Sequence, residues 1–314
     1  MAFDPRPYLR EIARGPHARR NLSREQAREL FAAVFAGEVE DLALGGILVA
    51  LRMKNESVDE IADMMQALAP HVATLRLPAG GVRPLILPSY NGARKLPNLV
   101  PLLALLAARA GVPVLVHGAL QEPARVGTFE ILARLGHPPA ASIDEAERGL
   151  ASHGLAAVPI ALLSPPLARV LGERARMGAR NAAHTLAKLL LPGGVDRHEA
   201  CRLVSITHPN FLELMRGYFA WEPGDALLMR GVEGEPVARL HAPQPILELR
   251  GGAETELAIE GADAAYPLPS READATARWT EDVLAGRTPA PAALAGEVAL
   301  IARHCGAGRR APAG

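Results

Sequence analysis

The chain has 314 residues, enough for two domains or for one large domain with a smaller appendage. Its composition, 49% hydrophobic with few aromatic residues, favours a helix-rich soluble protein. A net charge of zero argues against a uniformly basic nucleic-acid binder, and every apolar run is too interrupted to span a membrane. The N-terminus lacks the apolar core of a signal peptide. Cys201 and Cys305 lack metal-ligand spacing, so we expect a reduced, cytoplasmic protein.

Residues 1–75 predict a small all-helical domain. Ser23 and Ser57 each precede an amphipathic run, and a serine at that position accepts hydrogen bonds from the N–H groups of the first helical turn. Between these runs, residues 39–55 are apolar nearly all round and predict a buried helix. Residues 74–83, rich in Pro and Gly, predict the hinge to a second domain.

Residues 76–305 alternate short β-like runs with helical patterns. This alternation predicts an α/β domain with a mostly parallel central sheet covered by helices. Strands are expected at 85–87, 114–116, 156–160 and 226–230. Helices are expected near 97–110, 127–135, 144–153, 165–177, 181–191, 209–219, 271–287 and 291–305. Residues 231–263 predict a strand-and-turn excursion, and residues 306–314 predict a flexible tail.

The segment from Leu85 to Gly118 predicts a strand, a Gly-containing loop, a helix and a second strand. A loop that leads into a helix directs backbone N–H groups at an anion, so this order of elements is typical of a phosphate site. The loop holds one glycine, no acidic residue and the basic pair Arg94-Lys95. Contact with phosphates is the functional interpretation of this pair, and an exposed polar loop is the alternative.

Positive and negative charges are segregated along the chain. Residues 76–134 hold seven basic and two acidic side chains, and residues 166–202 hold seven basic and three acidic side chains. Residues 222–298, by contrast, hold fourteen acidic and six basic side chains. A neutral chain with this distribution can present one strongly positive face.

Three arginines of the second basic segment, Arg169, Arg176 and Arg180, recur at helical spacing and can form a stripe. The stripe either contacts nucleic acid or is a solvated helix face. His117 and His184 have no carboxylate partner at motif spacing, so we expect structural hydrogen bonds rather than acid-base catalysis. The spacing of the histidines and cysteines predicts no metal site.

Five motifs, in the right order, resemble the anthranilate phosphoribosyltransferase and nucleoside phosphorylase group, glycosyltransferase family 3. They are LRMKNESVDEIAD (51–63), VHG (116–118), Gly127 with ILARLG (131–136), LGERARMGARNAAHTLAKLLLP (171–192) and TARWTEDVLAG (276–286). The resemblance implies a homodimer formed through the helical domain, joined by part of the 165–190 helices. It also implies that residues 76–305 form a phosphoribosyltransferase-like domain.

The departures from this family fall at its substrate site. The family's GTGGD loop corresponds to residues 88–92 (Pro-Ser-Tyr-Asn-Gly), and its Asn-Ile-Ser-Thr turn corresponds to 98–101 (Asn-Leu-Val-Pro). Its Asp-Glu metal pair falls on 236–237 (Pro-Val), with only Glu235 nearby, and Lys188 replaces a family proline. These losses predict a non-catalytic protein without metal or cofactor. The alternative is a pentosyltransferase with an altered substrate site.

The loop NGAR is most similar to that of the YbiB-like branch, whose members are understood to bind nucleic acids. The resemblance implies largely sequence-independent contacts with the phosphate backbone of DNA, and RNA is a second candidate. The residues expected to bind nucleic acid are Arg83, Asn91, Arg94, Lys95, Arg125, Arg169, Arg176, Arg180 and Lys188. Tyr90 and Tyr218 are candidate stacking platforms for bases. A structural or regulatory partner protein is a further alternative.

Overall fold

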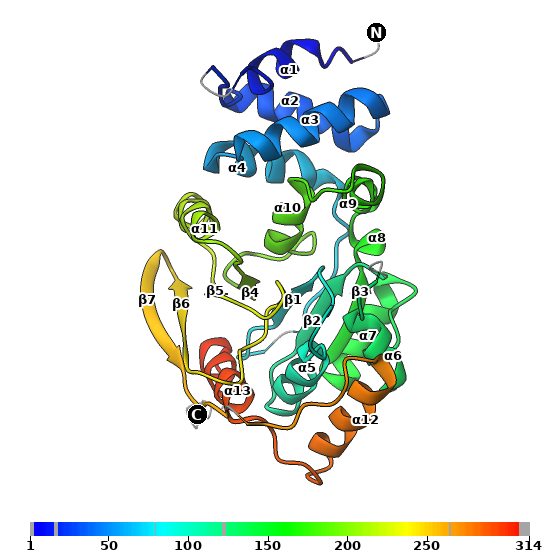
Figure 1. Cartoon of the computed structure of the whole chain (residues 1–314), viewed down its shortest axis with the longest axis vertical. Coiled ribbons are helices and arrows are strands. Elements are labelled where there is room, and N and C mark those ends of the chain that lie inside the picture. Colours follow the sequence, from blue (N-terminus) through cyan, green and yellow to red (C-terminus); the bar gives the residue numbers. More distant parts are fainter. Residues whose placement is uncertain (1–2, 16–17, 79, 121–123, 264, 308–314) are drawn as a thin grey trace.

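The structure, a computed structural model, places a helical layer above an α/β sheet (Figure 1). It describes residues 3–15, 18–78, 80–120, 124–263 and 265–307. Most of the predicted tail, from residue 308 onward, lies outside the described residues. No helix in the described part of the chain is long and apolar enough to cross a membrane.

Among the described residues, four helices form the N-terminal layer, which confirms its predicted all-helical character, although the first of them was not predicted. They are α1 (Arg6–Ile12), α2 (Arg24–Ala36), α3 (Asp41–Lys54) and α4 (Val58–Leu68), followed by the 3-10 turn η1 (Ala69–His71). Ser23 and Ser57 cap α2 and α4 through reciprocal bonds with Gln26 and Glu60. Glu60 also forms a buried ion pair with Lys54, 2.6 Å between Oε2 and Nζ. This pair ties the end of α3 to the start of α4, which gives the 51–63 motif a structural role.

In the described part of the chain, the sheet has seven strands in the order β3-β2-β1-β4-β5-β6-β7. The strands are β1 (Leu85–Ser89), β2 (Val114–Gly118), β3 (Leu155–Pro159), β4 (Cys201–Ser205), β5 (Ala226–Met229), β6 (Gln244–Arg250) and β7 (Ala253–Ile259). The first five are parallel and the last two antiparallel, which confirms the predicted α/β class. β4 was not among the strands predicted from the sequence. This strand contains the fully buried Arg202, and a buried arginine is unusual in a central strand.

Helices cover both faces of the sheet. One face carries α5 (Val100–Arg109), α6 (Thr128–Arg134), α12 (Ala273–Leu284) and α13 (Ala292–Cys305). The other carries α7 (Ile143–His153), α8 (Ile160–Leu163), α9 (Pro165–Met177), α10 (Ala183–Leu189) and α11 (Pro209–Trp221). Successive strand residues point to opposite faces of the sheet. Leu85 and Leu87 therefore join the first hydrophobic core, which lies between the sheet and the helices of the α5 face, and Ile86 joins the second core, on the opposite face.

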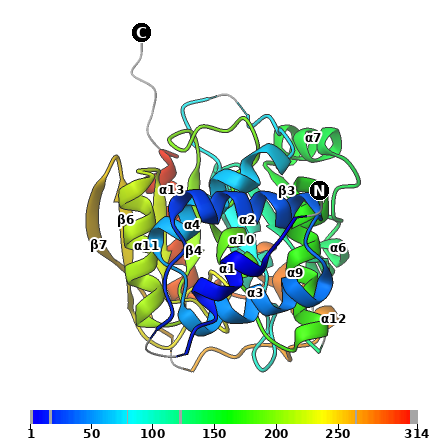
Figure 2. The same cartoon turned by 90° about the horizontal axis from the view of Figure 1, so that it is seen from above.

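The helices α9, α10 and α11 connect the sheet to the N-terminal layer. α9 packs against α2, whereas α10 and α11 pack against α4. Both views show α10 between α9 and α11, beneath the N-terminal helices (Figures 1 and 2). The carboxyl ends of the parallel strands meet at a single edge of the sheet, so the loops that follow them lie together. Strand order reverses between β1 and β4, and such a switch point is where open α/β sheets bind ligands.

Candidate anion site at the carboxyl edge of the sheet

The loop after β1 presents backbone N–H groups, but a carboxylate of the chain itself accepts them. Oε1 of Glu235 lies 2.6 Å from the backbone nitrogens of both Asn91 and Gly92. Its Oε2 accepts a hydrogen bond from the Ser89 hydroxyl, also at 2.6 Å. Glu235 is buried, so these are interior contacts rather than surface ones. The donors that would cradle a phosphate are therefore already bonded.

A second carboxylate accepts the N–H groups further along the loop. Glu233 accepts hydrogen bonds from the backbone nitrogens of Arg94, at 2.7 Å, and of Lys95, at 3.1 Å. Burial raises the pKa of Glu233, but the backbone N–H groups of Arg94, Lys95 and Leu96 outweigh it and lower the pKa overall. Burial raises the pKa of Glu235, and the hydrogen bonds that it accepts offset part of that rise.

The turn that carries both glutamates follows β5 and depends on two glycines. Gly234 has a backbone φ of +91°, which residues with a side chain rarely adopt. Its carbonyl accepts a hydrogen bond from Nδ2 of Asn91 at 2.6 Å. A Cβ atom on Gly231 would overlap the carbonyl of Glu235. The sequence RGVEGE thus forms a turn that directs two carboxylates at the loop after β1.

The N-terminus of α5 is capped by the chain as well. Oδ1 of Asn98 accepts the N–H of Val100 at 3.1 Å, and Pro101 has no N–H to offer. Nδ2 of Asn98 donates to the hydroxyl of Thr128 at 3.0 Å. The first N–H group of the helix end that the sequence indicated as an anion site is thus already bonded within the chain.

Two arginines reach the loop from neighbouring segments. Nη1 of Arg125 donates to the carbonyl of Gly92 at 3.2 Å, and the guanidinium of Arg180 donates to Oδ1 of Asn91. The side chains of the loop's own basic pair are exposed beside them. The structure therefore brings together five predicted residues: Asn91, Arg94, Lys95, Arg125 and Arg180.

Lys188 lies beneath this surface rather than on it. Its Nζ donates to the carbonyl oxygen of Ser205 at 2.8 Å and to the hydroxyl oxygen at 3.1 Å. Burial and the neighbouring Arg180 lower the pKa of Lys188 to about 8, whereas Glu235 opposes that shift. Its position indicates that Lys188 supports the loop from below, in contrast to the phosphate contact expected from the sequence.

Three further predicted residues do not join the site. Arg83 precedes β1, at the opposite edge of the sheet, and forms an ion pair with Asp225. Arg169 donates to a backbone carbonyl of α2, and Arg176 forms an ion pair with Asp41 of α3, 2.8 Å between Nη2 and Oδ2. Arg169 and Arg176 therefore connect α9 to the N-terminal layer and do not form a stripe that faces the loop.

The candidate stacking tyrosines are both buried. The hydroxyl of Tyr90 lies 2.7 Å from Nδ1 of His117, and burial lowers the pKa of His117 to about 3. Tyr218 packs among aromatic neighbours in the second core. Tyr218 is therefore not an exposed platform for bases, whereas Tyr90, although buried, contributes to the lining of the cavity described next. His184 has a pKa of about 3, chiefly because it is buried, and its Nδ1 lies 3.3 Å from the Asn181 carbonyl.

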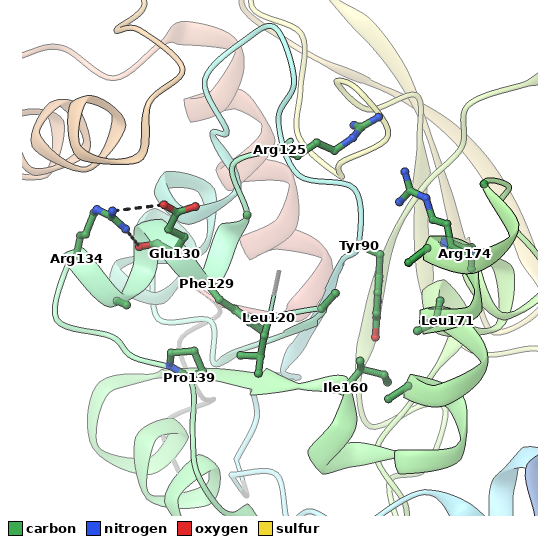
Figure 3. Close-up of a pocket in the computed structure, with 18 residues that line it drawn as sticks. Tyr90, Leu120, Arg125, Phe129, Glu130, Arg134, Pro139, Ile160, Leu171 and Arg174 are labelled. Atoms are coloured by element: carbon green, nitrogen blue, oxygen red, sulfur yellow. Dashed lines mark hydrogen bonds and ion pairs between the residues drawn. The ribbon is translucent and has the colours of Figure 1, made fainter. Parts of the chain in front are cut away.

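A cavity of about 1090 Å³ opens beside the loop, between the carboxyl edge of the sheet and α9 (Figure 3). Arg125 and Arg174 point toward each other at one end of it, near Tyr90 (Figure 3). Its apolar lining includes Leu120, Phe129, Pro139, Ile160 and Leu171. Arg174 was not among the predicted binding residues. Its place in the second basic segment was the only signal, because helical spacing alone does not show which face of α9 meets the cavity.

The comparisons with known proteins agree with this fold. A family model described as "Glycosyl transferase family, helical bundle domain" matches residues 6–71. The uncharacterized protein YbiB of Escherichia coli is 41% identical over 294 residues, covering 93% of this chain and 91% of that protein. The anthranilate phosphoribosyltransferase of Rhodospirillum rubrum is 28% identical over 253 residues, covering 81% of this chain and 72% of that enzyme.

Solved structures show the same relationship. Anthranilate phosphoribosyltransferase from Thermus thermophilus matches with a TM-score of 0.74 and 28% identity, covering 93% of this chain and 87% of that one. The enzyme from Saccharomyces cerevisiae, solved in complex with PRPP and Mg, matches with a TM-score of 0.76 over 96% of this chain and 88% of that one, at 14% identity, which shows the fold alone. The chain therefore belongs to the family of YbiB, which is built on the scaffold of the anthranilate phosphoribosyltransferases.

Proposed function

We propose that this protein binds nucleic acid through the phosphate backbone and does not transfer phosphoribosyl groups. The observation that carries the proposal is the pair of carboxylates, from the turn after β5, that accept the backbone N–H groups of the loop after β1. Glu235 accepts the N–H groups of Asn91 and Gly92, and Glu233 accepts those that follow. A diphosphate would meet two carboxylates where it needs donors, so repulsion replaces binding at this position.

The residues of this chain do not fit a magnesium-bound diphosphate. Mg²⁺ is usually held by one or two carboxylates together with the phosphates of its substrate. Pro236 and Val237 offer no such ligand, and the carboxylate of Glu235 is buried in hydrogen bonds. The described residues contain no group of three or more side chains that could hold a metal ion. The poor fit of these residues to a magnesium-bound diphosphate is the reason for preferring nucleic-acid binding over transferase chemistry.

The same edge of the sheet supports contact with a polymer of phosphates. Arg94 and Lys95 extend from the loop into solvent, and Arg125, Arg174 and Arg180 approach from the neighbouring segments. Such side chains reach phosphates without a cradle of backbone amides, and they carry no sequence information. Binding should therefore tolerate any sequence and weaken steeply as salt increases.

We also propose that the protein forms a homodimer through α3. Leu42, Val49 and Met53 are spaced seven and four residues apart, so they lie on one side of this helix. Leu42 is 91% exposed and Met53 is 67% exposed. Large apolar side chains gathered in this way favour a protein partner, and a second copy of the same helix offers a matching surface.

A salt titration tests the nucleic-acid proposal. The affinities for labelled single-stranded DNA, duplex DNA and RNA are measured by fluorescence anisotropy at several salt concentrations. Each phosphate contact adds about −0.9 to the log–log slope on B-DNA, so replacing Arg94 and Lys95 by Ala should make the slope shallower by about 1.8. Arg287→Ala, which removes an exposed, ion-paired arginine elsewhere, is the matched control. An affinity that does not change with salt would contradict the proposal.

The transferase alternative has its own test. Release of pyrophosphate from phosphoribosyl pyrophosphate is followed with Mg²⁺ and a panel of amine acceptors. We expect no turnover above the uncatalysed rate, because the loop donors are bonded to Glu235. Turnover at an enzyme-like rate, about 1 s⁻¹ or more, would favour an altered transferase.

A further inference from the structure

We propose that the outer edge of β7 binds a basic, extended segment of a partner protein, which joins the sheet as an additional strand. β7 is the last strand in the order of the sheet, and among the described residues β6 is the single strand that pairs with it. An unpaired edge presents a row of backbone N–H and C=O groups, and extended peptides bind to such edges by pairing with them. This second surface is independent of the basic one on which the proposed function depends.

Pro245 of β6 shows which backbone groups of β7 face outward. It lies directly opposite Ala258 in the antiparallel register and has no N–H group. In such a register, pairs of residues that exchange two hydrogen bonds alternate with pairs that exchange none. The pair of Pro245 and Ala258 belongs to the second kind, so the N–H and C=O groups of Ala258 point away from β6. By the same alternation, those of Glu254 and Glu256 also point outward.

The turn between β6 and β7 leads to the same assignment. It has two residues, Gly251 and Gly252, between the paired residues Arg250 and Ala253. In a turn of this length, the carbonyl of the first flanking residue accepts a hydrogen bond from the N–H of the last. Ala253 and, two residues further on, Thr255 therefore bond to β6, and the residue between them faces outward.

The side chains along β7 differ between the two faces of the sheet. Glu254 and Glu256 lie on the face covered by α11, where Nη2 of Arg216 lies 2.6 Å from Oε1 of Glu254. Glu256 is exposed and forms no ion pair in the described part of the chain. Leu257 lies on the opposite face and packs against the first hydrophobic core. The edge is thus acidic on one face and partly apolar on the other.

These two faces specify the kind of strand that fits the edge. Opposite charges on neighbouring strands stabilise a sheet, and like charges directly opposite each other destabilise it. A lysine or arginine beside Glu256 and a β-branched side chain beside Leu257 therefore fit, and the two kinds of residue alternate along the added strand. A second copy of β7 would place carboxylates beside carboxylates, so the edge favours a basic strand of another protein over self-association.

The edge of β7 is separate from the basic surface around Arg94 and Lys95. β7 lies at the outer edge of the sheet, whereas β1, which leads into the basic loop, is central (Figure 1). β7 is the fourth strand from β1 in the order of the sheet, and neighbouring strands are about 4.8 Å apart, so the two lie about 19 Å apart along the sheet. We therefore expect a peptide and a nucleic acid to bind at the same time.

Three labelled heptapeptides probe the edge, with binding measured by fluorescence anisotropy. The first, KVKVKVK, has the charge and the alternation that fit β7. The second, KVKPKVK, keeps every charge and replaces the central valine by proline, which cannot donate a backbone hydrogen bond. The third, EVEVEVE, reverses the charges. We expect the wild type to bind KVKVKVK about tenfold more tightly than KVKPKVK, and to show no binding of EVEVEVE.

Two substitutions change the edge from the side of the protein. Ala258→Pro removes an outward N–H group and changes no charge, and prolines occur in edge strands where the N–H faces solvent. It should weaken the binding of KVKVKVK about tenfold. Glu256→Gln removes one charge and should weaken binding by up to about fivefold. Glu281→Gln, which removes an exposed carboxylate of α12, is the matched control and should not change binding.

Thr255→Pro is the control for the direction of the backbone groups. The N–H of Thr255 faces β6, so this substitution breaks a hydrogen bond of the sheet and should lower the melting temperature. Ala258→Pro breaks no such bond and should melt close to the wild type. A decrease as large as that of Thr255→Pro would show that Ala258 faces β6, which overturns the proposal.

The binding results decide the rest. The proposal is overturned if Ala258→Pro binds KVKVKVK as the wild type does. It is also overturned if the wild type binds KVKVKVK and KVKPKVK equally, because attraction between charges then explains the binding. Self-association of the wild type that Ala258→Pro abolishes would make a second copy the occupant of the edge, against the proposal. The peptide results stand whether or not the wild type binds DNA, so failure of the proposed function is recognised separately.

Discussion

Glu235→Ala should weaken the fold and, at the same time, open the anion site that Glu235 fills. The substitution leaves the buried N–H groups of Asn91 and Gly92 without their acceptor. The hydroxyl of Ser89 loses one partner but keeps Thr128, 2.7 Å away. Each orphaned buried donor costs about 1–3 kcal/mol, so two cost about 2–6 kcal/mol.

Removal of the buried Glu235 carboxylate offsets part of this loss in the free energy of unfolding. Burial raises the pKa of Glu235, which shows that its charged form is disfavoured inside the protein. We therefore expect a net decrease of about 2–4 kcal/mol in the free energy of unfolding, within the stability of a typical domain, about 5–15 kcal/mol. Glu235→Gln keeps an acceptor oxygen and should lose less.

The assay is urea denaturation with and without inorganic pyrophosphate. In Glu235→Ala the exposed donors should bind the anion, which stabilises the variant by about 2.7 kcal/mol at a concentration 100 times its Kd. The wild type should gain nothing, because its own carboxylate occupies the donors. The reasoning is refuted if Glu235→Ala is as stable as the wild type, or if pyrophosphate stabilises both proteins equally.

Three further predictions concern other parts of the chain. Burial raises the pKa of Glu297 from 4.5 to about 8. The free energy of unfolding that this carboxyl contributes is therefore fully present below pH 4.5 and is lost as the pH rises through 8. Glu297→Gln should remove this loss when urea denaturation is measured between pH 4.5 and pH 8. Leu42→Asp with Met53→Asp should convert a dimer to a monomer in analytical ultracentrifugation without changing the circular dichroism, and a monomeric wild type at micromolar concentration would exclude the α3 interface. Lys54→Met should cost about 3–5 kcal/mol because Glu60 is left buried without its partner, and Glu60→Gln in the same chain should recover part of it; a neutral single variant would argue against this ion pair.

Much of the fold could be predicted because it depends on local patterns. The serine caps of α2 and α4, the apolar helix α5 and the short apolar strands β1 to β3 all leave signals within a few residues. β4 was missed because Arg202 interrupts its apolar run. The partners of its Nη1 group, the Leu189 carbonyl and Glu222, lie in other elements that only the fold brings close.

The candidate site shows the limit of that local information. The sequence by itself determined that a basic, glycine-poor loop follows β1 and leads into a helix, and that this loop differs from a diphosphate cradle. Only the tertiary structure decided that Glu235, 144 residues away from Asn91, accepts the loop's N–H groups. The strand order β1-β4-β5 brings the ends of β1 and β5 to the same edge of the sheet. The same long-range packing turned Arg169 and Arg176 toward the N-terminal helices, because helical spacing specifies a shared face but not what that face meets.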